Sequence, residues 1–302
     1  MSNRRNFIKQ VASLSAVGLI NPTELIASND SEHLCIMHTN DVHSHIEPFP
    51  NNHSKYPGMG GVAKRAQLIN KIRSEVKHTL LLDAGDMFQG TPYFNYYGGE
   101  LEFKLMNAMK YDAATIGNHD FDNGVDGLAK QAVNAKFKLL SANYNFEQTP
   151  MKGLTKPSHI FNKGKFKIGV FGLGIEFKGL VDPKMYGKTR YSDPIKEAKK
   201  TAQFLRENKG CNLIICLSHL GLEYSTNKVS DKLLAKQCPE IDIILGGHTH
   251  TFLEKPIETY SNLGKATYIS QVGWAGLKLG RIDVYLKPEA KTLTIKAQNS
   301  II

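Results

Sequence analysis

Histidine, aspartate and asparagine side chains recur in five short clusters along this chain. The clusters are Asp41-Val42-His43, Asp86, Asn118-His119, His219 and His248-Thr249-His250. They offer oxygen and nitrogen lone pairs without a thiolate, a donor set that suits divalent Mn, Zn, Fe or Co better than it suits a closed cysteine zinc site. One histidine alone is more often a structural residue. Five such clusters together indicate a metal centre.

Each cluster follows a run of apolar residues that is typical of a β-strand. The predicted strands are residues 34–39, 79–83, 113–116, 139–142, 166–172, 212–218 and 241–245, and the predicted helices are residues 61–76, 101–110, 125–135, 194–208 and 229–237. This alternation predicts an α/β fold. Three further strands, at 268–271, 278–286 and 292–298, predict that the sheet ends mixed or antiparallel. Because ligands bind at the carboxyl ends of strands in open α/β sheets, we expect the clusters to converge in space.

Length and composition favour one large α/β domain, which we expect to span residues 29–302. The net charge of +10 suits an anionic substrate, but there is no Lys/Arg block or RNA-binding aromatic motif, so nucleic-acid binding is not expected. The four cysteines stand singly and indicate small buried side chains rather than disulfides: Cys35, Cys211, Cys216 and Cys238.

Residues 1–28 have the pattern of a twin-arginine-type signal peptide. Arg4-Arg5 precede a weakly apolar stretch at 11–20, and the string Asn3 to Lys9 resembles the twin-arginine motif with Asn for the usual Ser and Ile for Leu. A basic helix of the mature protein is the alternative. No stretch reaches the roughly 18 apolar residues of a membrane span, so we expect export to the periplasm without a permanent membrane anchor.

Taken in order, the clusters resemble the motifs of the calcineurin-like metallophosphoesterases. The strings His38-Thr39-Asn40-Asp41-Val42-His43-Ser44-His45 and Gly117-Asn118-His119-Asp120-Phe121-Asp122 are similar to those of the bacterial 5′-nucleotidase/UDP-sugar hydrolase branch. The resemblance extends from about residue 34 to the end of the chain. It implies a four-layer α/β/β/α sandwich with two divalent metal ions at its rim, which would cleave phosphomonoesters through a metal-bridging hydroxide.

The resemblance also implies a role for each site residue. Asp41, His43, Asp86 and His250 would bind the first ion, and Asp86, Asn118, His219 and His248 the second, with Asp86 as the bridge. His119 and Asp122 match the catalytic pair. Many relatives have Glu at the position of Asp120, so the choice between Asp120 and Asp122 as the partner of His119 stays open.

Relatives in this branch usually carry a second, C-terminal domain that holds the nucleoside with aromatic side chains and arginines. We expect this chain to comprise the catalytic domain alone, acting on a nucleotide or another phosphate ester. A separately encoded 5′-nucleotidase C-terminal-domain protein is therefore one partner hypothesis. Two alternatives remain: a thiosulfohydrolase-like two-metal enzyme, and a non-catalytic metal-binding subunit of a split 5′-nucleotidase.

Other residues with chemical potential have simpler interpretations. His38 and His45 flank the first cluster, where ordinary packing is favoured over support of the ligands. The aromatic run Tyr93, Phe94, Tyr96 and Tyr97 either stacks a substrate or packs in a loop, and loop packing is favoured. Surface positions are expected for His33, His53, His78 and His159. No arginine falls in a cluster loop, since Arg65, Arg73, Arg190, Arg206 and Arg281 all lie elsewhere.

Overall fold

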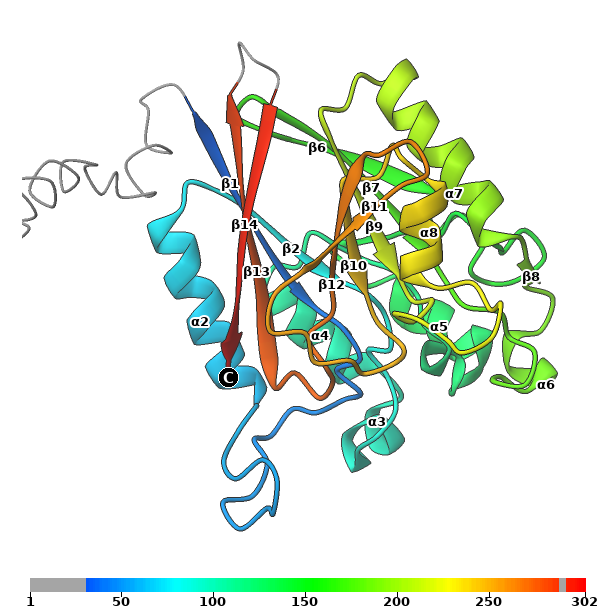
Figure 1. Cartoon of the computed structure of the whole chain (residues 1–302). Coiled ribbons are helices and arrows are strands. Elements are labelled where there is room, and N and C mark those ends of the chain that lie inside the picture. The colour runs from blue at the N-terminus through cyan, green and yellow to red at the C-terminus, as the bar shows by residue number, and fades with distance from the viewer. Residues whose placement is uncertain (1–30, 288–291) are drawn as a thin grey trace, which may run out of the picture.

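The structure is a computed structural model that describes residues 31–287 and 292–302 (Figure 1). The predicted signal peptide at residues 1–28 lies outside the described residues. Within the described part, no helix is both long enough and apolar enough to cross a membrane.

Two six-stranded sheets form the centre of the fold. The first has the order β14 (Thr292–Ile301), β13 (Lys278–Lys287), β1 (Glu32–Thr39), β2 (His78–Asp83), β3 (Ala113–Ala114) and β4 (Lys138–Leu139). The second has the order β11 (Ile257–Tyr260), β12 (Ala266–Ser270), β10 (Ile243–Gly246), β9 (Leu213–Ser218), β7 (Phe166–Leu173) and β6 (Ser158–Lys163). A small antiparallel pair joins β5 (Tyr144–Asn145) to β8 (Arg190–Tyr191).

Both sheets are mixed, with four parallel strands each and antiparallel strands beside them. The strands β1, β2, β3 and β4 run parallel, whereas β13 pairs antiparallel with β1 and with β14. In the second sheet β7, β9, β10 and β12 run parallel, and β6 and β11 are antiparallel edges. The prediction that the C-terminal strands make the sheet mixed is confirmed. These strands do not all join one sheet, however: β12 belongs to the second sheet, and β13 and β14 belong to the first.

Helices cover the outer face of each sheet. The helical segments are α2 (Val62–Glu75), α3 (Pro92–Tyr97), α4 (Glu100–Ala108), η1 (His119–Phe121), α5 (Gly124–Ala132), α6 (Pro183–Tyr186), α7 (Pro194–Gln203), η2 (Phe204–Asn208) and α8 (Asp231–Gln237). Figure 1 shows α2 beside the first sheet and α7 and α8 beside the second. Asp193 caps α7 by accepting the Ile195 and Lys196 N–H groups, and Pro194 occupies its first turn.

The period-two alternation of strand side chains builds three cores. Leu34 and Ile36 of β1 point between the sheets and meet Ile168 of β7 in the central core. The alternate residues Cys35 and Met37 point outward into the core under α2, α4 and α5. A third core lies between the second sheet and α7 and α8. The layers are therefore α/β/β/α, and the predicted four-layer fold is confirmed.

The element predictions differ from the structure at several places. Of the predicted strand 139–142, only the two-residue strand β4 at Lys138–Leu139 forms. The Leu140 N–H still donates to the Ala114 carbonyl of the first sheet, whereas the Ala142 N–H donates to the Gly172 carbonyl of the second sheet, both at 2.8 Å. The chain crosses between the sheets there. The aromatic run 93–97 is the helix α3 and not a loop. The edge strand β6 was not expected, since its half-exposed residues give no apolar run.

Candidate metal centre and active site

Backbone hydrogen bonds join the loops that follow β1 and β2. The Asp41 N–H donates to the Gly85 carbonyl at 2.9 Å, and the His43 N–H donates to the Asp86 carbonyl at 3.1 Å. Because β1 and β2 are adjacent parallel strands, both loops leave the same edge of the sheet. The first two clusters therefore lie side by side, as their strand-end positions predict.

The site loops hold non-glycine residues in left-handed backbone conformations. Among the described residues, six of the nine non-glycine residues with positive φ belong to the metal-ligand clusters or adjoin them, with φ between +49° and +72°: Asp41, His43, Ser44, Asp86, His248 and His250. Each such conformation costs on the order of 1–3 kcal/mol for a residue with a Cβ, and it persists only where surrounding contacts enforce it. Strain of this kind typically gathers at functional sites.

Asp41, His43 and His250 form the first group of donors. Each contributes one ligand atom, and these atoms lie within 4.8 Å of one another. The two imidazole Nε2 atoms of His43 and His250 are 3.0 Å apart, and His250 Nε2 is 3.4 Å from Asp41 Oδ1. The Asp41 carboxylate is itself held by the N–H of His248, at 3.0 Å from each oxygen.

Asp86, His219 and His248 form the second group, again with ligand atoms within 4.8 Å. His219 Nε2 is 3.0 Å from Asp86 Oδ2, and the same carboxylate oxygen is 3.8 Å from His43 Nε2 in the first group. Asp86 thus lies between the two groups. Asn118 joins the second group, since its Oδ1 lies 2.9 Å from His248 Nδ1.

The hydrogen-bond pattern of the histidines fits cations at both groups. His219 Nδ1 donates to the Ala84 carbonyl at 2.8 Å, and His43 Nδ1 donates to the Phe88 carbonyl at 3.1 Å. With Nδ1 donating, Nε2 of each ring faces carboxylate oxygens, and it can offer its lone pair to a cation once it carries no proton. Buried His219 Nε2 has no hydrogen-bond partner. Lone pairs that face one another in this way need a positive charge between them.

The electrostatics of His219 support the same interpretation. Burial alone would lower the pKa of the fully buried His219, but the adjacent Asp86 carboxylate raises it to about 10. Such a shift means that the surroundings of Nε2 strongly favour a positive charge. A divalent cation would satisfy this demand, and the mixed N/O donor set suits Mn, Zn, Fe or Co.

Glycines let the loops approach this closely. A Cβ on Gly117 would come within 2.2 Å of Asp86 Oδ1. A Cβ on Gly247 would lie 2.9 Å from His219 Nδ1 and 3.0 Å from Asp41 Oδ2. Larger residues at these two positions would displace the carboxylates of both groups.

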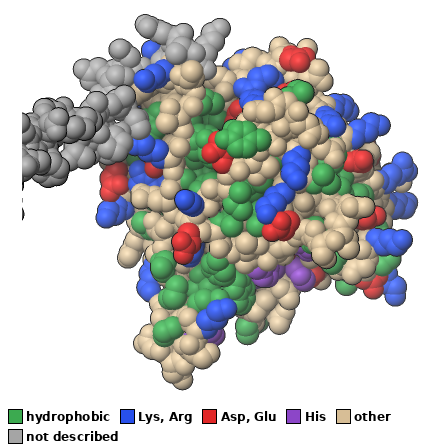
Figure 2. Space-filling model, viewed as in Figure 1, with side chains coloured by type: hydrophobic (Ala, Val, Ile, Leu, Met, Phe, Trp, Pro, Cys, Tyr) green, Lys and Arg blue, Asp and Glu red, His purple; other side chains and the backbone are tan. Residues whose placement is uncertain are grey.

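His119 and Asp122 lie at the rim of the donor groups. His119 Nδ1 is hydrogen-bonded to Asp122 Oδ2 at 2.9 Å, and its ring meets His43 edge-on with centroids 5.3 Å apart. The hydrogen bond to Asp122 raises the pKa of His119. Both side chains are about one third exposed, so a substrate can reach them. Figure 2 shows histidine side chains exposed at the lower part of this face.

Asp120 has a different function from Asp122. It is fully buried and accepts the backbone N–H groups of Gly117, Asp86, Met87 and Phe88 at 2.8–3.2 Å. Burial raises its pKa to about 7. Asp120 therefore ties the Asp86 loop to the Asn118 loop, and the partner of His119 in this structure is Asp122.

The flanking residues meet several of the other expectations. His38 is fully buried and bonds Ser270 of the second sheet at 2.9 Å, which is a packing role. His45 packs edge-on against Trp274, which stacks on His250 at 5.8 Å. All four cysteines are buried and free. Of the aromatic run, only Phe94 packs in the core, while Tyr96 is 82% exposed, so loop packing is wrong for most of it.

Two of the histidines expected at the surface are partly buried and paired. His33 bonds Asp283 at 2.7 Å, and His78 lies 3.1 Å from Glu32. Neither of them lies in the two donor groups.

Sequence reasoning missed the residues that support the histidine loop 248–250. Gln271 is fully buried, donates to the Gly247 carbonyl at 2.8 Å and accepts the Thr249 hydroxyl at 3.0 Å. Buried Asp231 accepts the hydroxyl of Ser218, the residue before His219. Both lie outside the motifs, and no spacing rule connects them to the site.

Comparison with known proteins places the chain among phosphoesterases. The calcineurin-like phosphoesterase family model matches residues 35–252. A snake venom 5′-nucleotidase from Naja atra is 35% identical over an alignment of 281 positions. This alignment covers 86% of this chain and 51% of that protein. A 5′-nucleotidase from Vibrio cholerae is 33% identical over an alignment of 296 positions, which covers 90% of this chain and 52% of that protein.

Among solved structures, a 5′-nucleotidase precursor from Thermus thermophilus superposes with a TM-score of 0.80 and 31% identity. The match covers 90% of this chain and 55% of that one. The chain thus spans about half the length of the relatives that it matches.

Proposed function

This chain belongs to the calcineurin-like phosphoesterase family, and from that premise we propose that it hydrolyses phosphate monoesters with two divalent metal ions. Nucleoside 5′-monophosphates are the proposed substrate class, because the similar proteins from Naja atra, Vibrio cholerae and Thermus thermophilus are named 5′-nucleotidases. The observation that carries the proposal is geometric: two adjoining groups of lone-pair donors meet at Asp86, with His119 beside them.

The proposed ligands follow from that geometry. Asp41, His43, Asp86 and His250 would hold the first ion. The second ion would be held by Asp86, Asn118, His219 and His248, and Asp86 would be shared between the two. When bound, two such ions supply a positive site for the phosphate and make a water molecule a stronger nucleophile at neutral pH. The Phe88 and Ala84 carbonyls keep His43 and His219 in the tautomer that coordinates through Nε2.

We assign the proton transfer to His119. In the proposed reaction, the water oxygen bonds to phosphorus and releases one proton to solvent, while the ester P–O bond breaks. The leaving oxygen takes a proton from Nε2 of His119, and solvent then reprotonates the imidazole. Asp122 accepts a hydrogen bond from Nδ1–H of His119, which fixes the ring orientation and favours the charged imidazolium. The raised pKa of His119 is consistent with a group that carries a proton to the leaving group.

Location and partners belong to the same proposal. Residues 1–28 would direct export through the twin-arginine route, and hydrolysis would then occur in the periplasm. A second protein, resembling the part of the relatives that this chain does not match, would supply contacts to the nucleoside. The thiosulfohydrolase alternative predicts cleavage of a sulfur ester instead, and the non-catalytic alternative predicts metal binding without turnover.

A chelation assay tests the proposal. Purified chain should release phosphate from p-nitrophenyl phosphate and AMP, lose this activity in EDTA, and recover it with Mn²⁺, Co²⁺ or Zn²⁺. Metal analysis should approach two ions per chain, a value that Asp86→Asn should reduce. Full activity in chelator without bound metal would refute the mechanism. Metal binding without activity on any ester would favour the non-catalytic alternative, and a thiosulfate-ester substrate tests the remaining one.

A further inference from the structure

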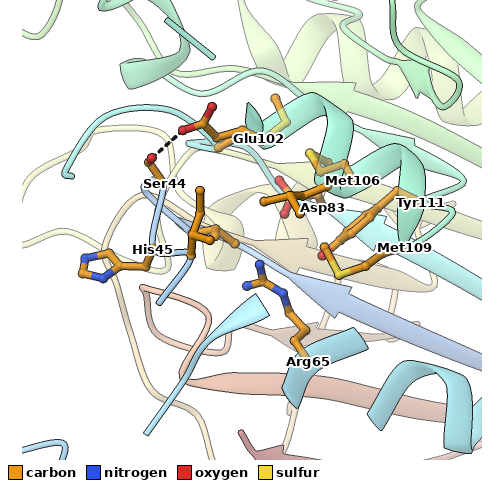
Figure 3. Close-up of a pocket in the computed structure, with 12 residues that line it drawn as sticks. Ser44, His45, Arg65, Asp83, Glu102, Met106, Met109 and Tyr111 are labelled. Atoms are coloured by element: carbon orange, nitrogen blue, oxygen red, sulfur yellow. Dashed lines mark hydrogen bonds between the residues drawn. The ribbon is translucent and has the colours of Figure 1, made fainter. Parts of the chain in front are cut away.

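A small cavity of about 30 Å³ lies beneath the first two site loops (Figure 3). Ser44 and neighbouring residues of the 41–46 loop form one wall, and Asp83 at the end of β2 forms another. Arg65 enters from α2, and Glu102 enters from α4. Figure 3 shows Glu102 meeting Ser44 at one side and the Arg65 guanidinium pointing inward from the opposite side.

Two of the charged side chains in this cavity lack partners for buried atoms. Arg65 is 4% exposed, and neither its Nε nor its Nη1 has a hydrogen-bond acceptor. Glu102 is 6% exposed, and its Oε2 has no donor. Leaving such groups unsatisfied is strongly unfavourable. Because one buried water needs about 10–15 Å³, the cavity of about 30 Å³ has room for about two water molecules, and its lining includes the polar side chains of Arg65, Asp83 and Glu102.

We propose that ordered water in this cavity links Arg65 to Glu102 and Asp83, and that Arg65 is a positioning residue for the metal centre. The guanidinium is the cation that balances two buried carboxylates. Water supplies the hydrogen bonds that no side chain makes directly. This inference rests on the metal site of the proposed function.

Each carboxylate of the network holds one ligand loop. Glu102 accepts the hydroxyl of Ser44, the residue after His43. Asp83 accepts the Gly85 N–H at 2.9 Å, next to Asp86, and the Thr39 hydroxyl at 2.5 Å. Loss of the Arg65 charge would leave both buried carboxylates without a compensating cation. We therefore expect the loops carrying His43 and Asp86 to shift together.

Arg65 also contacts a third loop. A Cβ on Gly276 would lie 2.0 Å from Arg65 Nη1, so the guanidinium packs directly against that glycine. The neighbouring Ala275 N–H donates to the Asp41 carbonyl at 2.8 Å. Arg65 is thus connected to Asp41 indirectly, through the backbone of the 275–276 loop.

Calorimetric titration with Mn²⁺ tests the role of Arg65 without relying on activity. Arg65→Met should weaken Mn²⁺ binding by about tenfold or more, the usual consequence of losing a residue that supports metal ligands. Arg73→Met is the matched control, because Arg73 lies on the same helix but bonds the Met109 and Lys110 carbonyls at 2.7 and 2.8 Å. It should lower the melting temperature and leave Mn²⁺ affinity unchanged.

Glu102→Gln keeps the test decisive if Arg65→Met does not fold, since it preserves shape and the Ser44 contact but removes one charge. It should also weaken Mn²⁺ binding, and the double variant should lose less affinity than the two single losses combined. Unchanged Mn²⁺ affinity in Arg65→Met and Glu102→Gln would overturn the inference, even if both melt earlier. An absence of Mn²⁺ binding by the wild type would instead refute the proposed function.

A high-resolution crystal structure gives an independent check. Water should lie within hydrogen-bonding distance of Arg65 Nε and Glu102 Oε2. A dry cavity would overturn the proposed water link.

Discussion

At the residue scale, His119 stands apart from the other histidines of the site. Its Nδ1 bonds Asp122, and it contributes to neither donor group. We therefore predict that His119→Asn lowers kcat by about 10²-fold or more while Mn²⁺ affinity stays at the wild-type value. Steady-state kinetics on p-nitrophenyl phosphate and calorimetry measure the two effects. Wild-type kcat in this variant would disprove the proton-transfer assignment.

Separate substitutions of Asp120 and Asp122 distinguish a residue that orients His119 from one that stabilises the fold. Asp122→Asn should lower kcat with little change in melting temperature, because the Asp122 carboxylate is part exposed and, among the described residues, bonds the His119 ring. Asp120→Asn should lower stability by about 1–3 kcal/mol, since an amide replaces a buried carboxylate that accepts four backbone N–H groups. Thermal melts beside kinetics separate the two variants. The reverse pattern would exchange the roles assigned here.

The sequence predicts the donor residues of this site better than their supports. Asp41, Asp86 and the paired histidines carry recognisable spacing, and each follows an apolar strand. Asp120 has the same residue type and nearly the same position as Asp122, so only burial and backbone contacts distinguish them. In the sequence, Arg65 looks like an ordinary residue of an amphipathic helix. Its position beneath the loops with His43 and Asp86 depends on how α2 packs.

At the scale of elements, local patterns locate most strands but do not decide which sheet they join. The strand β13 pairs with β1 through Glu32 and Leu286, residues that lie 254 positions apart. Nothing in either segment specifies that partner, because the alternation of β13, with Ile282 and Val284 on one face and Arg281 on the other, orients the strand without choosing its neighbour. Very short strands are hard to predict from the sequence for a different reason. The strand β3 has two residues, and its position depends on β2 and β4 beside it.

The turn between β3 and η1 gives a prediction at this scale. Gly117→Ala should weaken Mn²⁺ binding at least tenfold, because the new Cβ would collide with Asp86 Oδ1 and displace the shared carboxylate. Gly169→Ala in β7 is the matched control, since its Cβ would meet only the Leu205 side chain, at 3.0–3.2 Å. Calorimetry on both variants measures the difference. Equal Mn²⁺ affinities would show that the Gly117 turn can open without cost to the site.

At the scale of the whole molecule, the two sheets divide the site between them. The first sheet carries the loops with Asp41, Asp86 and Asn118, and the second carries those with His219 and the paired histidines 248 and 250. The central core fixes the spacing of the two sheets, so it also fixes the distance between the ligand sets. The resemblance of the motifs implied this architecture, whereas the alternation of elements alone predicted only an α/β fold.

The arginines of the described residues bear on substrate choice. Arg65 is buried under the loops, Arg73 bonds carbonyls of the segment after α4, Arg206 pairs with Asp242, and Arg281 pairs with Asp283. Arg190 lies on β8, in the small pair with β5. Within residues 31–287 and 292–302, none of these belongs to the donor groups or to the His119 pair. Within the described residues, the donor groups and the His119 pair therefore include no guanidinium that could bind the rest of the proposed nucleotide substrate.

Substrate preference follows from that distribution. Contacts with remote parts of a substrate lower KM and align the reacting bond, and here the described residues supply few of them. We predict that the purified 302-residue chain hydrolyses AMP and p-nitrophenyl phosphate with kcat/KM values within about tenfold of each other. A tenfold ratio corresponds to about 1.4 kcal/mol of differential binding, which is small for a site that grips a nucleoside. Parallel kinetics at saturating Mn²⁺ measure the ratio, with adenosine as a competitor to detect nucleoside binding. A preference for AMP of a hundredfold or more, with inhibition by micromolar adenosine, would show that these residues already form a complete nucleoside pocket.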